Sequence, residues 1–266
     1  MKWKQLISGL KPVALLSLSI NMALATGALV AQAAPQNKAR VAIEQAIEAM
    51  GGQAFSKVRD IQTEGRYFPF KDGRSLGLVR YLDYTRIPDR SRFQLGLGKN
   101  AQIFVHNLEL GKGWVQEGKD EIKEVSETEL KEFRRNIKHT LELVFRTRYK
   151  DPEVKLFYFG PEELSGGGEA MEAVELLDPE NISTLVYIDR TTHLPVRIEY
   201  TTFNKLGVKL KEEVEYSNWQ VVEGVKVPFN VQITVDNQTS SQTFIEKITF
   251  NAPIPESFFQ KPVPKK

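Results

Sequence analysis

Short segments in which apolar and polar side chains alternate recur along this chain, and they limit its fold more than any other feature. In one of them, Val231, Ile233 and Val235 alternate with Gln232 and Thr234. Successive side chains of a strand point to opposite faces, so this segment has one dry face and one wet face. Such strands are typical of an antiparallel sheet with one face on a core.

Similar segments, rich in aromatic or β-branched residues and bounded by turn formers, make up most of the chain. We expect strands at 61–68, 76–86, 90–95, 102–107, 112–116, 121–125, 155–159, 173–177, 184–189, 195–201, 208–216, 227–235 and 243–250. Short turns between consecutive strands favour a meander, and about a dozen strands in one sheet would curl. The sequence therefore predicts a curved antiparallel sheet with a concave face.

Two helical patterns interrupt the strands. The segment 38–50 carries an apolar stripe and ends at Gly51-Gly52, a C-terminal cap, and a short turn at 54–58 follows. Ser126 and Glu129 form a capping box that starts a longer helix, which Asp151-Pro152 stops. The apolar stripe of that helix can cover the concave face as a lid; its members are Leu130, Phe133, Ile137, Leu141 and Val144.

The longer helix is basic, and its charge has two readings. From Lys131 to Lys150 it carries seven basic and two acidic residues. A basic amphipathic helix can lie on an anionic membrane surface or meet an acidic partner. The alternative, which we favour, is a solvated outer face on a packed helix.

The first 33 residues read as a cleaved signal peptide. Lys2, Lys4 and Lys11 precede an apolar run at 13–30, and Ala31-Gln32-Ala33 supplies a cleavage site. A permanent membrane anchor is the alternative. The chain has no cysteine, and Ala34 follows the site, so we expect an exported protein that is not lipidated.

Charge and motif content argue against nucleic acid binding and catalysis. The signal holds three of the 36 basic residues and none of the 34 acidic ones, so the mature chain is nearly neutral. His106, His139 and His193 are far apart, and we expect them to be solvated rather than metal ligands. No nucleophile elbow, P-loop or dinucleotide motif occurs. We therefore expect no enzyme activity, no cofactor and no metal.

The aromatic residues of the strands are either ordinary core or the wall of an apolar cavity. If the concave face is not filled by its own side chains, the cavity and its lid hold the ligand. The candidate ligand-binding residues are Phe93, Trp114, Phe133, Ile137, Leu141, Phe157, Tyr187 and Phe229.

The C-terminal half carries a recognisable layout of strands and turns. It comprises 187–197, 216–228 and a closing segment 248–255 followed by Phe258-Phe259, together with the helix end at Ala49 to Gly52. This layout resembles the envelope proteins related to the lipoprotein carriers LolA and LolB, over nearly all of the mature chain. The resemblance implies an unclosed antiparallel β half-barrel, lidded by α-helices around an apolar cavity, that carries acylated lipoproteins or binds lipids.

Together these features predict a signal peptide at 1–33, a single half-barrel domain at 34–260 and a disordered tail at 261–266. The expected function is a monomeric, non-catalytic periplasmic binder or carrier of a lipid, a lipoprotein acyl chain or another apolar ligand. Other envelope proteins or a membrane surface are possible partners. The alternative is an envelope interaction or scaffold module with a filled core, and a hydrolase is the third candidate.

Overall fold

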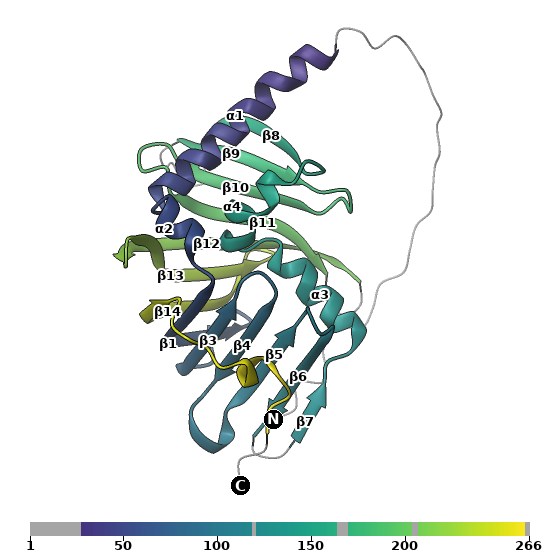
Figure 1. Cartoon of the computed structure of the whole chain (residues 1–266), viewed down its shortest axis with the longest axis vertical. Coiled ribbons are helices and arrows are strands. Elements are labelled where there is room, and N and C mark those ends of the chain that lie inside the picture. Colours follow the sequence, from purple (N-terminus) through teal and green to yellow (C-terminus); the bar gives the residue numbers. More distant parts are fainter. Residues whose placement is uncertain (1–27, 119–120, 164–169, 204–206, 264–266) are drawn as a thin grey trace, which may run out of the picture.

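A single large antiparallel sheet dominates the computed structural model, which describes residues 28–118, 121–163, 170–203 and 207–263 (Figure 1). The strands are β1 (Asp60–Lys71), β2 (Arg74–Ser75), β3 (Val79–Arg86), β4 (Arg90–Leu95), β5 (Gln102–Asn107), β6 (Lys112–Glu117), β7 (Glu121–Glu124), β8 (Lys155–Glu163), β9 (Ala170–Leu177), β10 (Ser183–Asp189), β11 (Pro195–Phe203), β12 (Lys209–Val222), β13 (Val225–Val235) and β14 (Gln238–Phe250). These bounds confirm the predicted strand pattern. The main difference is β12, which continues past Tyr216 to a hairpin turn at Glu223-Gly224.

The sheet is unclosed, as predicted. Its order is β7-β6-β5-β4-β3-β1-β14-β13-β12-β11-β10-β9-β8, with β2 paired to β1. Pairing of β1 with β14 joins two meanders, and β7 and β8 form the two edges. Since β8 is the next strand after β7 in the sequence, the segment between them must run from one edge of the sheet to the other.

Helix α1 (Ala28–Ala49) packs against β8 and β9, and the short α2 (Gln53–Lys57) follows it. Its predicted apolar stripe is buried: Ala39, Ala42, Ile43, Ala46 and Ile47, with Met50 just beyond its end. Gly51 has φ +115, and a side chain there would collide with the carbonyl oxygen of Gly224. The helix starts ten residues earlier than predicted, because the alanine-rich stretch 28–34 has high helix propensity.

The predicted single helix from 126 to 150 is wrong in one respect: it is broken. The structure has α3 (Glu127–Ile137), α4 (Leu141–Arg146) and the 3-10 turn η2 (Arg148–Lys150). The Ser126–Glu129 capping box is confirmed at the start of α3. The break follows from Thr140, whose hydroxyl donates to the carbonyl of Ile137 and accepts from the amide of Leu143 at 3.4 Å. Thr140 therefore starts a new helix.

The main buried cluster lies at one end of the sheet, where α1 and α4 pack against β8 to β11. Phe145 and Val144 of α4 are fully buried there, with Leu176, Val186 and Ile198 of the sheet. This end of the concave side is therefore filled by its own side chains. Among the described helices, none is long and apolar enough to cross a membrane.

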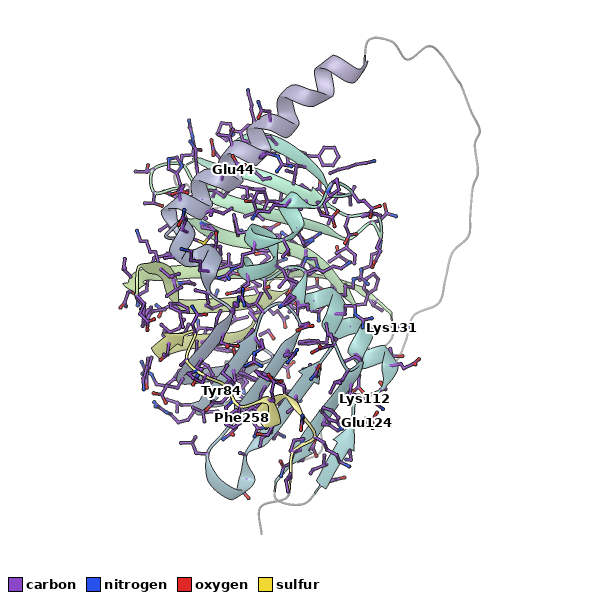
Figure 2. The ribbon with its side chains drawn as sticks, in the orientation of Figure 1. Glu44, Tyr84, Lys112, Glu124, Lys131 and Phe258 are labelled. Atoms are coloured by element: carbon purple, nitrogen blue, oxygen red, sulfur yellow. The ribbon has the colours of Figure 1, made fainter. Side chains whose placement is uncertain are left out.

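The C-terminal segment runs across the opposite face of the sheet, over β3 to β5 (Figure 1). Its 3-10 turn η3 (Glu256–Phe259) places Phe258 against Tyr84, with ring centroids 5.0 Å apart (Figure 2). The side-chain amide of Asn107 donates to the carbonyl of Phe259 at 3.1 Å. Pro262 of the predicted tail is buried, while residues 264–266, like residues 1–27 of the predicted signal, lie outside the described residues.

Candidate ligand-binding cavity

A cavity of about 640 Å³ separates the lid helices from the middle of the concave face. Its floor comes from β1, β3, β4 and β11 to β14, and its roof is the segment 133–146 of α3 and α4. Ligand sites for small molecules usually enclose about 300–1,000 Å³. Most of the wall is apolar, including Ile61, Phe93, Ile137, Val231, Ile233 and Ile245. This part of the molecule therefore has the size and surface of a site for an apolar ligand.

The cavity exists because several strands of the floor carry short side chains there. Thr63, Thr85, Val231 and Thr243 point into it from four different strands. None of these side chains is long enough to reach the lid, whereas α1 fills the concave face beside them. The filled-core alternative from the sequence is thus correct for the end under α1 but not for the middle of the sheet.

Four of the eight predicted site residues lie together in this cavity. Phe93 comes from the floor, while Phe133, Ile137 and Leu141 come from the lid. Their contact with a ligand remains a prediction, but the structure brings all four to one space.

The other four predicted site residues do not line the cavity. Trp114 packs with Ile103 and Val105 in a separate small cluster on the far face. Phe157 lies between Leu156 and Tyr158, which both face the core, so its ring points to the opposite side. The last two also stand outside the lining: Tyr187 is buried between two core residues of β10, and Phe229 is half-buried on β13.

His139 lies in the break between α3 and α4 and anchors the lid to the sheet. It is 3% exposed, so the expectation of a solvated histidine is wrong. Its Nδ1 is 2.7 Å from the hydroxyl of Thr184, and its ring stacks on Tyr200 with centroids 3.9 Å apart. Burial, reinforced by the charge of Arg148, lowers the pKa of His139 to about 3. The imidazole is therefore neutral at physiological pH.

Arg148 also connects the segment between α3 and α4 to the sheet. Its guanidinium donates to the carbonyl of Lys138 at 2.9 Å, to the carbonyl of Ile182 at 3.2 Å and to the hydroxyl of Thr184. The carboxylate of Asp178 lies 3.8 Å away. Burial lowers the pKa of Arg148, although arginine stays charged. This residue therefore does not belong to a solvated basic face, as we had expected of the helix.

His106 is also covered rather than solvated. Its ring stacks on Phe133 of α3, with centroids 3.9 Å apart and planes 7° from parallel. Burial lowers the pKa of His106 to about 4. This stack packs α3 against β5.

Two carboxylates break the apolar character of the cavity. Asp83 projects from β3 on the floor, and Glu142 projects from α4 in the lid. Burial and the nearby charge of Glu142 raise the pKa of Asp83 to about 7, against a hydrogen bond of 3.3 Å from Thr85. Asp83 is half-buried, because its side chain borders the cavity.

A single arginine of the lid faces the same space. Arg146 donates to the carbonyl of Val58, and its guanidinium lies 4.3 Å from the ring centroid of Phe55. Burial lowers its pKa. Arg90, on the floor, is paired with Glu256 at 2.8 Å. Both cations in the wall are thus engaged with other parts of the chain.

Sequence reasoning missed Asp83, although one signal could have found it. Tyr81, Asp83 and Thr85 occupy alternate positions of a strand, in phase with one another. An acidic residue on the side of a strand that otherwise faces the core is costly to bury, so it indicates a candidate functional site.

Within the described residues, no group of three or more His, Asp or Glu side chains is placed to hold a metal ion. The adjacent carboxylates of Glu212 and Glu213 point to opposite faces of the sheet: Glu212 accepts from Tyr200, while Glu213 lies 2.6 Å from Lys211.

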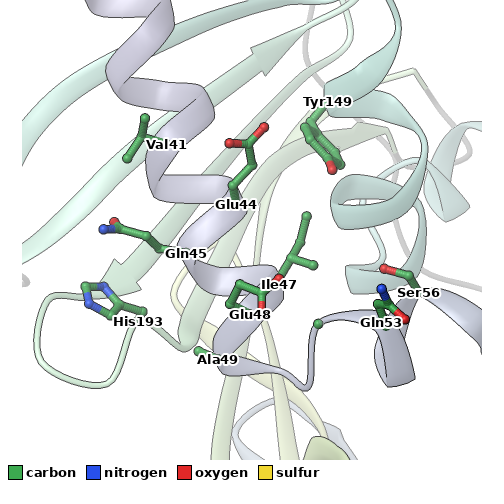
Figure 3. A pocket seen from close by; sticks show the side chains of 11 residues that line it. Val41, Glu44, Gln45, Ile47, Glu48, Ala49, Gln53, Ser56, Tyr149 and His193 are labelled. Carbon is green, nitrogen blue, oxygen red and sulfur yellow. The ribbon is translucent and has the colours of Figure 1, made fainter.

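A second depression lies on the outside of α1. It encloses about 730 Å³ and is bordered by exposed side chains of the helix, with Tyr149 and His193 beyond them (Figure 3). Glu44, Gln45 and Glu48 give it a polar border. It is a surface groove beside the helices, and it has much less apolar wall than the cavity under the lid.

Comparison with known proteins shows relatives in fold but not in sequence. No protein-family model matches the chain, and no curated protein matches it in sequence. Similar solved structures include a DUF1329 family protein from Desulfovibrio piger, with a TM-score of 0.56 and 12% identity. A putative outer membrane lipoprotein-sorting protein domain from Vibrio parahaemolyticus and a LolA superfamily protein from Nitrosomonas europaea each have a TM-score of 0.51 and 14% identity.

Each of these three alignments covers 84% of this chain and 97% of the other protein. The similarity thus extends over the whole of each relative, and it includes both meanders of the sheet. At such low identity it establishes the fold alone. The chain has a LolA-like fold, in agreement with the resemblance found in its sequence.

Proposed function

We propose that this protein is an exported, non-catalytic binder or carrier of a lipid, an acyl chain or another apolar ligand in the bacterial periplasm. The observation that carries the proposal is the cavity of about 640 Å³ between the curved sheet and its helical lid. Each Å² of apolar surface that leaves water on binding contributes roughly 25 cal/mol. A chain laid along this wall is stabilised mainly by that term.

The fold supports the proposal in a second way. One of the similar structures is described as a domain of a putative outer membrane lipoprotein-sorting protein. Signal-peptide cleavage after Ala33, the absence of lipidation and a monomeric state belong to the proposal. The first two are inferred from the sequence pattern of the first 35 residues and from the lack of cysteine.

A cavity-filling substitution tests the proposal. Ile233→Trp places an indole in the space between β13 and the lid, while Val221→Trp adds the same side chain at a position that is 67% exposed. We expect the purified protein to bind a neutral, apolar naphthylamine dye, with about tenfold weaker binding for Ile233→Trp, which is the effect of losing roughly 1.4 kcal/mol. Val221→Trp should bind as the wild type does.

Native mass spectrometry of protein purified gently from the periplasm of its own host identifies the natural ligand. A reproducible extra mass that organic solvent releases would support the carrier function. A clean apo mass, combined with no dye binding and no uptake from envelope lipid extract, would contradict it and favour an interaction module.

A further inference from the structure

Two carboxylates, those of Asp83 and Glu142, border the cavity. Among the described residues, no lysine, arginine or histidine forms an ion pair with Asp83 or with Glu142. The hydroxyl of Thr85 is a neutral donor to one oxygen of Asp83. Both side chains border the same cavity, one from the floor and one from the lid.

The cationic groups around this space make their hydrogen bonds elsewhere, although the charges of Arg146 and Glu142 attract each other. Arg146 is on the same helix as Glu142, but its guanidinium is directed to the carbonyl of Val58 and the ring of Phe55. Arg90 is held by Glu256. His139 is neutral, because its pKa is lowered to about 3. A ligand in the cavity thus meets two carboxylates that form no ion pair, in a wall that is mostly apolar.

The two carboxylates favour one class of amphiphile over others as the ligand of the cavity. The carboxylate of a fatty acid would be repelled by like charges in a medium of low dielectric constant. A hydrocarbon would leave both carboxylates unpaired. An ammonium group has three N–H donors and a positive charge, so it can donate to both carboxylates at once.

We propose that the cavity takes an amphiphile with an amine head, held as the ammonium between Asp83 and Glu142, with its alkyl chain along the apolar wall. The inference rests on the proposed function of the cavity, and it adds the chemical class of the ligand. Because one carboxylate belongs to the sheet and the other to α4, the ammonium joins the floor to the lid. Binding of the ligand therefore stabilises the packing of α4 over the sheet.

The proposal predicts a dependence on pH. The charged or titratable groups that line the cavity are Tyr81 of β3, Arg90 of β4, His139 beside α4, Glu142 and Arg146 of α4, Tyr200 of β11 and Tyr216 of β12. Burial raises the pKa of Asp83 to about 7, whereas burial raises the pKa of Tyr81 to about 12 and also raises those of Tyr200 and Tyr216. An alkylamine stays cationic in this range, so its affinity should rise from pH 6 to pH 8 as Asp83 ionises.

Dodecylamine, dodecanol and dodecanoate, each below its micellar concentration, are compared as competitors of the neutral dye. At pH 8 we expect dodecylamine to bind about tenfold more tightly than dodecanol, and dodecanoate to bind most weakly, since a charge-assisted hydrogen bond is roughly twice as strong as a neutral one. The readout is the ratio of amine to alcohol affinity within one protein, so a general loss of binding does not imitate the effect.

In Asp83→Asn the ratio should fall toward one, and in Glu142→Gln it should fall in the same direction. Asp72→Asn, which removes an exposed carboxylate in the turn after β1, should leave the ratio unchanged. Equal or tighter binding of dodecanoate, or a ratio that is unaltered in Asp83→Asn, would overturn the inference and leave the proposed function standing. Failure of all three competitors and of the dye would instead overturn the proposed function.

Discussion

Replacing Asp83 with asparagine should stabilise the protein at high pH and leave its stability nearly unchanged at low pH. The burial that surrounds this carboxyl favours its protonated form, and the charge of Glu142 acts in the same direction. In the unfolded chain the same carboxyl ionises with an ordinary pKa of 3.8, whereas in the folded protein its pKa is about 7. Ionisation of Asp83 therefore lowers the free energy of unfolding. Asparagine cannot ionise, and its side-chain carbonyl can still accept the hydrogen bond from Thr85.

The size of the effect follows from linkage. Below pH 4 the carboxyl is protonated in both states, so it exerts no penalty. Between pH 4 and pH 7 the unfolded state loses the proton while the folded state keeps it, so the free energy of unfolding falls. Each pH unit between the two pKa values corresponds to about 1.4 kcal/mol. The full difference gives about 4 kcal/mol, and screening by water in the half-accessible cavity reduces this to about 2 kcal/mol.

Urea unfolding followed by tryptophan fluorescence at pH 4.5, 6 and 8 measures the difference between Asp83→Asn and the wild type. Groups that both proteins share cancel in that difference. The exposed variant Asp72→Asn should change the free energy of unfolding by less than about 0.5 kcal/mol. An Asp83→Asn protein that is no more stable than the wild type at pH 8, or a stability gain that is the same at all three pH values, would refute the reasoning.

Two further predictions concern the anchor of the lid. Arg148→Met removes three hydrogen bonds from a buried guanidinium, so it should lower the free energy of unfolding by about 3 kcal/mol in urea, whereas Arg134→Met on the exposed side of α3 should cost less than about 0.5 kcal/mol. His139 has its pKa lowered to about 3, so the unfolded chain takes up a proton near pH 6.5 that the folded protein excludes, and stability is lost as the pH falls below that value. In His139→Asn, whose amide can still hydrogen-bond to Thr184, the free energy of unfolding should fall by about 2 kcal/mol less than in the wild type between pH 6.5 and 4.5, measured by the same urea assay. Equal losses in the two proteins would contradict a neutral, buried His139.

The sequence predicted the sheet well because its signals are local. Alternation in each strand, the glycine cap after Met50 and the Ser126–Glu129 capping box depend on residues a few positions apart, and the structure contains each of them. The consequences of many consecutive strands, namely curvature and an unclosed sheet with a lid, follow from general geometry. These features needed no knowledge of distant contacts.

The choice of sheet face could not be predicted in the same way. Alternation shows that Trp114 and Val115 face opposite sides, but it does not show which side is concave. In β12 the backbone of Asn218 has φ 55, and the pairing with β13 skips this residue. The register does not shift there, and Phe229, which alternation places in phase with Val227 and Val231 of the wall, nevertheless lies outside the wall.

The burial of the histidines depends on long-range contacts that no local pattern reveals. His139 meets Thr184, 45 positions away in the sequence, and Tyr200 beyond it. Helical periodicity placed His139 on the polar side of a continuous helix. The break before Thr140 turns it inward instead.

The connection between the two edges of the sheet explains why this fold has a lid at all. The strand that follows β7 in the sequence is β8, and these two are the unpaired edges of the sheet. A connection between opposite edges of a curved sheet is shortest across its concave side, so α3 and α4 lie there. The two helices are held unequally: α4 buries Leu141, Val144 and Phe145, whereas Leu130 is the buried residue of α3. Since segments with less buried apolar surface open at lower free energy, α3 is the part of the lid that can move away while α4 keeps Glu142 opposite Asp83.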